Sequence, residues 1–253
     1  MSSPRTRRRT AAPSERVRVR RVHEKASYER DAVEAILDEA LVAHVGFVHD
    51  GHPLVIPTLH ARIGEDVYVH GSSASRTLRT LATTVPVCIT VTLLDGMVFA
   101  RSMFEMSVNY RSVVVVGEAR PVTDAEEKLR ALEAFSEQVL PGRWAQARQP
   151  SRKELKATAV LALSLAEASA KISAGGPDDG ESEDAALDVW AGHLPIRLVA
   201  GEAVPCPHLR SGIPLPDDIA GYQRRLTPNG QSEATAGRSS GSEPYTSSTS
   251  IAP

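Results

Sequence analysis

The sequence contains little cysteine and few aromatic residues. Its 253 residues include two cysteines, Cys88 and Cys206, and aromatic side chains make up 4% of the chain. This content predicts neither a disulfide framework nor a cysteine-rich metal cluster, and it fits a reducing cytoplasm. The chain also lacks a run of about 18 apolar residues, so no membrane-spanning helix is expected. Because no apolar signal segment is apparent near the first residue, we expect a cytoplasmic protein without membrane contacts.

Several catalytic signatures are missing as well. The sequence shows no Walker loop, no Gly-x-Gly-x-x-Gly segment after a strand, and no Ser/His/Asp order with a nucleophile elbow. P-loop hydrolysis, Rossmann-type dinucleotide binding and serine hydrolysis are therefore not predicted. No cluster of cysteine or carboxylate accompanies His44, His49, His52 and His60, so we expect no zinc site. A haem axial ligand among these histidines stays open.

Positive charge is concentrated at the start of the chain, although the net charge is −2. Residues 1–25 carry nine basic and two acidic side chains, which fits either a nucleic-acid-binding arm or a solvated tail. No aromatic residue interrupts the basic run to stack on bases. We therefore predict a disordered basic tail over residues 1–22 and do not expect nucleic acid as a partner. A C-terminal extension, 202–225, and a Ser-, Gly- and Thr-rich disordered tail, 226–253, close the chain.

Hydrophobic spacing predicts mostly strands between these ends. Asp50-Gly51 is a two-residue hairpin signal, and Asp95-Gly96 predicts a second turn. An amphipathic helix with Thr123 or Asp124 as its N-cap is expected near the middle of the chain. Predicted strands lie within 42–63 (two strands), 66–71, 85–94, 97–101, 109–122, 157–165 and 188–201, and predicted helices cover 28–41 and 123–140.

Consecutive strands with short turns predict an antiparallel barrel or sandwich. A doubly wound sheet needs a helix between most strands, and such helices are absent from the pattern. We expect a mainly β (α+β) domain over residues 23–201 with peripheral helices. The acidic, Gly-rich segment 175–188 is predicted to form a loop outside the fold.

The segment YVHGSSASRTLRTLA, residues 68–82, begins as a strand and ends as a helix. The first turn of a helix leaves N–H groups unpaired and favours an anion. Ser72 adds a hydroxyl, Ser75 is the expected N-cap, and Arg76 and Arg79 add guanidinium donors. The spacing fits a phosphate monoester site or a capped helix whose arginines are merely solvated.

Three segments carry a resemblance to a known family. They read HVGFVHDGHPLVIPTLHARIGEDVYVHGSSASRTLRTLA, PVCITVTLLDGMVFARS and NYRSVVVVGEARPV. They resemble the pyridoxamine 5′-phosphate oxidase-related flavoproteins, within them the branch of nitroimidazole-resistance (Nim-type) proteins. The resemblance spans residues 20–200. It implies an FMN-binding split β-barrel that forms a homodimer with cofactor sites at the subunit interface.

The resemblance also implies roles for individual residues. Ser75 and Arg76 match the family's Ser-Arg phosphate grip, and Thr77 stands where many relatives have lysine, so Arg79 would have to compensate. The other implied cofactor contacts are Pro57 and Thr58 along the flavin edge, His70 and Gly71 beneath the ring, Tyr110 and Arg111 reaching across from the partner subunit, and Lys171 and Trp190 on the last strands.

By this resemblance the protein is an FMN-dependent oxidoreductase of a small-molecule substrate, pyridoxamine 5′-phosphate oxidase-like or nitroreductase-like. F420 and haem, used by other members of this barrel superfamily, stay open as alternatives to FMN. A motif for holding a cofactor is visible, whereas a motif for chemistry is not. A non-enzymatic flavin- or haem-binding carrier or redox sensor is therefore the alternative reading, and no catalytic residue or metal ligand is assigned.

Overall fold

A computed structural model describes residues 11–83 and 85–223, and it contains one antiparallel sheet within this part of the chain. The strand order is β1-β9-β6-β5-β2-β3-β4-β8-β7, and β10 pairs with the outer end of β5. The mainly β, antiparallel fold class with few helices is thereby confirmed and is consistent with a split β-barrel.

The strands are β1 (Ala26–Ser27), β2 (Val42–His49), β3 (His52–Ile63), β4 (Asp66–Ser72), β5 (Pro86–Phe99), β6 (Ser107–Glu118), β7 (Arg120–Pro121), β8 (Thr158–Ser164), β9 (Ala168–Ser173) and β10 (Gly192–Pro195). The helices are α1 (Arg30–Glu39), α2 (Arg76–Leu81), α3 (Ala125–Val139), α4 (Arg143–Gln146), α5 (Arg152–Ala157) and α6 (Asp217–Ala220). Short 3₁₀ turns lie at His23–Lys25, Leu165–Glu167 and Glu183–Ala186.

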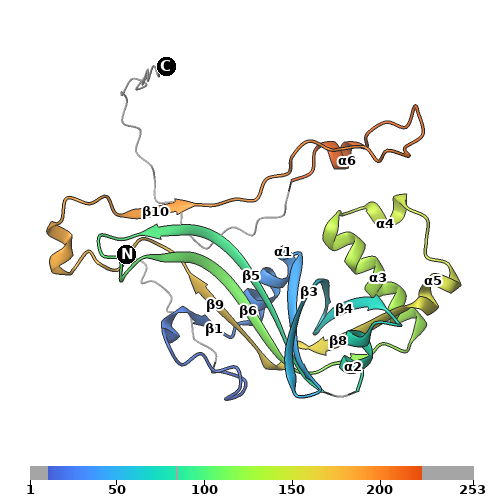
Figure 1. The fold of residues 1–253 in the computed structure, drawn as a ribbon, viewed down its shortest axis with the longest axis horizontal. Coiled ribbons are helices and arrows are strands. Elements are labelled where there is room, and N and C mark those ends of the chain that lie inside the picture. The colour runs from blue at the N-terminus through green and yellow to red at the C-terminus, as the bar shows by residue number, and fades with distance from the viewer. Residues whose placement is uncertain (1–10, 84, 224–253) are drawn as a thin grey trace, which may run out of the picture.

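The strongly curved sheet separates two apolar clusters. In Figure 1, β5 and β6 form a long twisted ribbon on one side, and α3, α4 and α5 gather with β4 and β8 on the other. The larger cluster packs Val33 and Leu37 of α1 against inward side chains such as Val91 and Val113 of the ribbon. The smaller cluster packs Phe135 of α3 against β4 and β8. The apolar stripe of each helix is thus buried on the sheet.

The two Asp-Gly pairs behave differently. Asp50 and Gly51 both have positive φ, 50° and 77°, and join β2 to β3 in a two-residue turn, which confirms the predicted hairpin. The prediction of a turn at Asp95-Gly96 is wrong. β5 runs through both residues and accommodates them as a register shift against β6. The chain reverses only after Phe99, and the carbonyl of Leu194 lies over Gly96, 2.9 Å from where a Cβ would stand.

Three further expectations need correction. The segment 168–173 forms a strand, β9, that the sequence pattern did not reveal, and the predicted strand over 188–201 is reduced to β10. The acidic segment 175–188 is joined to the fold, because the buried carboxylate of Asp179 accepts from the backbone N–H of Arg101 at 2.5 Å and from its guanidinium at 2.8 Å. Residues 11–22 belong to the described part of the chain, and Val17 among them is buried. The predicted tails 1–10 and 226–253 lie outside the described residues.

Two predicted helices are confirmed with shorter bounds. α1 buries Val33, Ile36 and Leu37, and α3 is capped by Asp124, whose carboxylate accepts from the N–H of Glu127 at 2.7 Å. Among the described residues, no helix combines the length and apolarity needed to cross a bilayer.

Candidate functional site

The Ser-rich turn between β4 and α2 holds its shape through its own hydroxyls and through β8. The Ser75 hydroxyl caps α2 by accepting from the N–H of Leu78 at 3.5 Å. The Ser72 hydroxyl accepts from the N–H of Ala74 at 3.2 Å, and the N–H of Ser73 donates to the carbonyl of Ala157 at 2.8 Å. The turn is therefore fixed to the start of the neighbouring strand before any ligand binds.

A cavity of about 180 Å³ lies directly beneath this turn. Five residues singled out from the sequence line it together: Pro57, Thr58, His70, Gly71 and Ser75. They come from β3, β4 and the cap of α2. The remaining lining residues are Val45, Ile56, Val69, Thr77, Leu78 and Leu81. The five apolar residues among these were not predicted as site residues, because on sequence they are indistinguishable from ordinary core positions.

The two arginines of α2 differ in their availability. Arg79 donates to the carbonyl of Ala74 at 2.9 Å, so one of its donors already stabilises the turn. Arg76 follows the cap residue directly, is exposed, and has no hydrogen-bond or ion-pair partner among the described residues. Arg76 is therefore the cation of this corner that is free to meet an anion, together with the unpaired N–H groups of the first helical turn.

His70 contributes to the cavity from β4 while its ring packs elsewhere. The imidazole lies 4.1 Å, centroid to centroid, from the ring of Phe135 on α3. Its Nδ1 is buried and has no partner among the described residues, and burial lowers the pKa of the ring. The neutral imidazole is thus favoured, and its packing fits a residue that orients the loop.

The structure does not bring three other predicted residues to this cavity within one chain. Tyr110 lies on β6, half-buried, opposite Leu94. Lys171 lies on β9, and its ammonium group contacts the carbonyl of Arg21 at 3.5 Å. Trp190 is 70% exposed and packs at 6.0 Å against the ring of Phe99. In the strand order, β9 and β6 are separated from β3 by β5 and β2.

Arg111 occupies a buried ion cluster inside the barrel. Its guanidinium donates to both carboxylate oxygens of Glu39, at 2.5 and 2.8 Å, and to both of Asp95, at 2.8 and 2.9 Å. The hydrogen bonds to Asp95 and then those to Glu39 raise the pKa of Arg111, so it is permanently charged. Four of the five N–H donors of this guanidinium bind the two carboxylates, so within one chain Arg111 holds this ion cluster together.

Comparison with known proteins identifies the family of this chain. The profile of the pyridoxamine 5′-phosphate oxidase family matches residues 29–172, which is more than half of the sequence and contains the cavity with its Ser-rich turn. The chain belongs to the pyridoxamine 5′-phosphate oxidase family. The family expected from the sequence motifs is thereby confirmed.

Solved structures of the family show how far the similarity extends. The flavocytochrome Anf3 from Azotobacter vinelandii is 42% identical, with a TM-score of 0.79 over 85% of this chain and 99% of that chain. The FAD and heme binding protein from Mycobacterium smegmatis is 40% identical, with a TM-score of 0.74 over 78% of this chain and 96% of that chain. No curated protein matches the chain.

One departure from the phosphate grip of the pyridoxamine 5′-phosphate oxidase family has a structural counterpart. Thr77 takes the place of the lysine that many relatives carry, and it lines the cavity. Lys128 of α3 reaches the same region, because its ammonium group donates at 3.1 Å to the carbonyl of Thr158, the residue paired with Ser72. Only the tertiary fold brings this cation near the turn, so no sequence pattern could indicate it.

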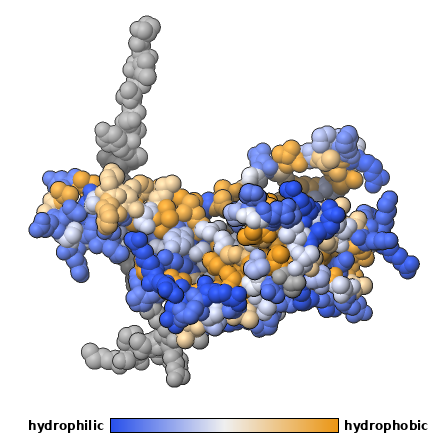
Figure 2. Space-filling view, turned by 60° about the horizontal axis from the view of Figure 1, so that its bottom comes forward, coloured by the Kyte–Doolittle hydropathy of each residue, from blue (hydrophilic) through white to orange (hydrophobic). Residues whose placement is uncertain are grey.

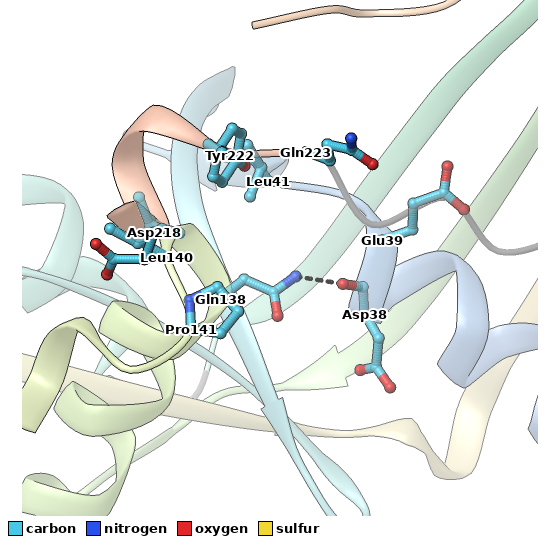
Figure 3. A pocket seen from close by; sticks show the side chains of 11 residues that line it. Asp38, Glu39, Leu41, Gln138, Leu140, Pro141, Asp218, Tyr222 and Gln223 are labelled. Atoms are coloured by element: carbon cyan, nitrogen blue, oxygen red, sulfur yellow. Dashed lines mark hydrogen bonds between the residues drawn. The ribbon is translucent and has the colours of Figure 1, made fainter. Parts of the chain in front are cut away.

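A second cavity, of about 220 Å³, lies between the ends of α1 and α3 and the segment around α6 (Figure 3). Its polar groups are largely occupied. The side-chain amide of Gln138 donates to the carbonyls of Asp38 and Ala40, each at 2.8 Å, and of Leu37 at 3.2 Å. Asp38 also accepts two hydrogen bonds from Arg62. We therefore take this cavity as a packing gap between helix ends.

Proposed function

We propose that this chain binds a flavin nucleotide at the cavity beneath the Ser-rich turn and acts as a flavin-dependent oxidoreductase. The observation that carries the proposal is the free guanidinium of Arg76, placed beside the Ser75 cap over a cavity lined by Pro57, Thr58 and Gly71. A phosphate at the turn satisfies Arg76 and the open N–H groups of α2 without rearrangement of the turn. FMN is the smallest flavin nucleotide that carries a phosphate, and FAD carries one at the same position of its ribityl chain.

Different residues of this site would bind different parts of such a nucleotide. Arg76, with Ser72 and Ser75, would hold the phosphate. Pro57 and Thr58 would lie along the ring edge, and the neutral His70 would hold the loop against α3. A bound flavin supplies hydride or single-electron transfer at its ring. The described part of the cavity offers no pair of acid and base groups, so the chain's part is orientation and exclusion of water.

A second function is favoured by the two solved structures described above. One is a flavocytochrome, and the other binds FAD and haem; both match this chain at 40% identity or more over at least 78% of its length. We propose on this basis that haem is a second cofactor and that electrons pass between flavin and haem. The chain would then be a redox carrier or an oxidoreductase with an internal electron acceptor.

We further propose a homodimer as the working form. Apolar side chains on adjacent strands are exposed to solvent, namely Val42 on β2, Val55 and Leu59 on β3, and Leu94 on β5. Contiguous exposed apolar surface of this kind marks interaction sites. A partner seated there would also bring its β6 and β9 residues toward the cofactor.

The proposal is tested on purified protein by its spectrum and by mass spectrometry of the small molecules released on denaturation. Oxidised-flavin absorbance with FMN or FAD in the released fraction is expected, and a Soret band with extractable haem is the sign of the second cofactor. A colourless protein that neither flavin reconstitutes contradicts flavin binding. Reduction by NADH or NADPH with turnover of an added acceptor separates an enzyme from a carrier.

The Arg76→Ala variant tests the placement of the phosphate. Hydrogen bonds to a charged group contribute about 1.5–3 kcal/mol, so flavin affinity should fall roughly 10- to 150-fold. Arg143→Ala on α4 is the matched control, because Arg143 is exposed and bonds only to Gln146 within its own helix. Equal affinity of the Arg76 variant and the control removes Arg76 from the site.

A further inference from the structure

The segment that follows β10 is an extended arm whose root is built into the fold. Here the arm denotes residues 196–216. Its first residue, Ile196, donates its N–H to the carbonyl of Asp95 at 3.0 Å, and the preceding strand β10 pairs with β5 from Gly96 to Phe99. In Figure 1 the arm then runs across the molecule, above the sheet, to α6. The arm is therefore held at both ends.

Between its ends the arm lacks the contacts that normally order a peptide segment. From residue 197 to 215, the one backbone hydrogen bond to another described residue runs from Leu209 to Cys206. Val204 is 89% exposed, and Leu198, Val199 and Leu215 are also exposed. Figure 2 shows apolar patches on the face that is turned forward from the bottom of Figure 1. Exposed backbone and apolar side chains in one segment indicate a surface that another molecule covers.

A cavity of about 480 Å³ opens under the start of the arm. Its walls are the arm residues Ile196, Arg197 and Leu198, facing the end of α1 and the middle of β5. Leu41, Val42, Leu93 and Leu94 make these facing walls mostly apolar, and Glu39 and Asp95 place two carboxylates beside them. A volume of this size accommodates one or two large apolar side chains.

The same chain also has an exposed apolar turn, which could pack against the apolar walls of this cavity. The turn that joins β5 to β6 presents Met103 and Phe104, the latter 88% exposed. β5 is continuous to Phe99, and five residues of strand beyond Leu94 place the turn at least about 17 Å from the cavity. The turn therefore cannot fold back into the cavity of its own chain.

We propose that the β5–β6 turn of one protomer inserts Met103 and Phe104 into the cavity under the arm of a second copy, and that the two copies clasp each other reciprocally. A two-fold axis would let each copy insert its turn into the cavity of the other, so that the assembly closes as a dimer; a head-to-tail arrangement of the same contact would instead give larger assemblies. The proposal rests on the homodimer proposed above and specifies how it is held.

The apolar area available agrees with a stable interface. Burial of one large aliphatic side chain contributes about 1.5–3 kcal/mol at 25 cal/mol per Å², which corresponds to roughly 60–120 Å². The turn, the arm and the exposed strand residues together supply about a dozen such side chains, on the order of the 800 Å² that each partner contributes to a standard interface. Their exposed aromatic anchor, Phe104, is of the type that dominates binding energy.

Sedimentation of the full chain and of Phe104→Asp tests the clasp. Wild type should have twice the monomer mass of 27.2 kDa, and Phe104→Asp should raise the dimer dissociation constant at least about tenfold. Leu129→Asp is the matched control, because Leu129 is an exposed leucine on α3, away from the turn and the arm. A monomeric wild type overturns the proposal, and so does a Phe104→Asp dimer that is as stable as the control dimer. Either result is also the one expected if residues 224–253 of the same chain occupy the cavity.

A cross-link establishes which surfaces meet. Chains carrying Phe104→Cys are mixed with chains carrying Leu198→Cys, both in a Cys206→Ser background, and oxidised. A disulfide-linked dimer that appears in the mixture and not in either chain alone supports the clasp, whereas its absence in a dimeric mixture contradicts it. Bound flavin is measured in parallel. A colourless clasped dimer refutes only the cofactor proposal, a flavin-bound dimer without the cross-link refutes only the clasp, and a monomer that retains flavin refutes the homodimer and the clasp but not flavin binding.

Discussion

Replacement of Arg111 by methionine tests the ion cluster inside the barrel. The substitution keeps the length and much of the volume of the side chain and removes its charge. Glu39 and Asp95 then face each other without the guanidinium that now donates four hydrogen bonds to their carboxylates. Both carboxylates are largely shielded, with 3% and 16% of their side chains exposed. Water can therefore replace the lost donors only at Asp95.

The magnitude follows from that geometry. Removal of one partner from a buried ion pair costs about 3–5 kcal/mol, because an uncompensated charge remains in a poorly solvated site. For a domain of this size, 1 kcal/mol shifts the melting temperature by about 2–4 °C, so the expected drop is roughly 6–20 °C. Arg120→Met is the control. Arg120 pairs with Asp66 and Glu127 at the surface with half of its side chain exposed, and such pairs contribute about 0–1 kcal/mol.

Urea unfolding at pH 7 compares Arg111→Met with wild type and with Arg120→Met. A loss of less than about 1 kcal/mol in Arg111→Met, the range of an exposed pair, would refute the reasoning.

Three further predictions concern the remaining polar and backbone features. Gly96→Ala should release β10, because the new Cβ would stand 2.9 Å from the carbonyl oxygen of Leu194, and faster hydrogen exchange at the β10 amides measures the release. Burial raises the pKa of Tyr68 to about 12, so the folded protein keeps this proton at pH values where the unfolded chain, with a tyrosine pKa of about 10, has lost it. The free energy of unfolding should therefore fall as pH rises from 10 to 12, and it should fall less steeply in Tyr68→Phe. Asp179→Asn should weaken the contact with Arg101 and make residues 175–188 an early site of limited proteolysis, and cleavage equal to wild type would contradict that anchoring.

The sequence predicts the local parts of this fold better than the distant ones. The Asp50-Gly51 hairpin is correct because both residues tolerate positive φ and the alternating flanks set the register. Asp95-Gly96 carries the same signal and fails, because pairing with β6 along the whole of β5 outweighs the local turn preference. β9 was not recognised, since short segments of small residues lack a clear period and depend on β6 and β1 for their pairing.

In the candidate site, too, the sequence predicts local features better than contacts between distant segments. Ser75 was predicted as a cap and is one, because a cap depends only on the next three residues. Its assembly with Pro57 and Gly71 followed from the family resemblance, and periodicity alone did not predict it. Arg111 illustrates the limit, because its carboxylate partners lie 16 and 72 residues away in the sequence. A charged residue in a strand gives no indication of whether distant acids will enclose it.

The contact of Gln138 with the end of α1 has a consequence for how the protein folds. One amide from α3, about 100 residues further along the chain, caps the last carbonyls of a ten-residue helix. Helices of this length are marginal by themselves in water. We therefore expect α1 to remain frayed during synthesis until α3 has emerged and docked. The two helices would then become fully structured together, late in folding.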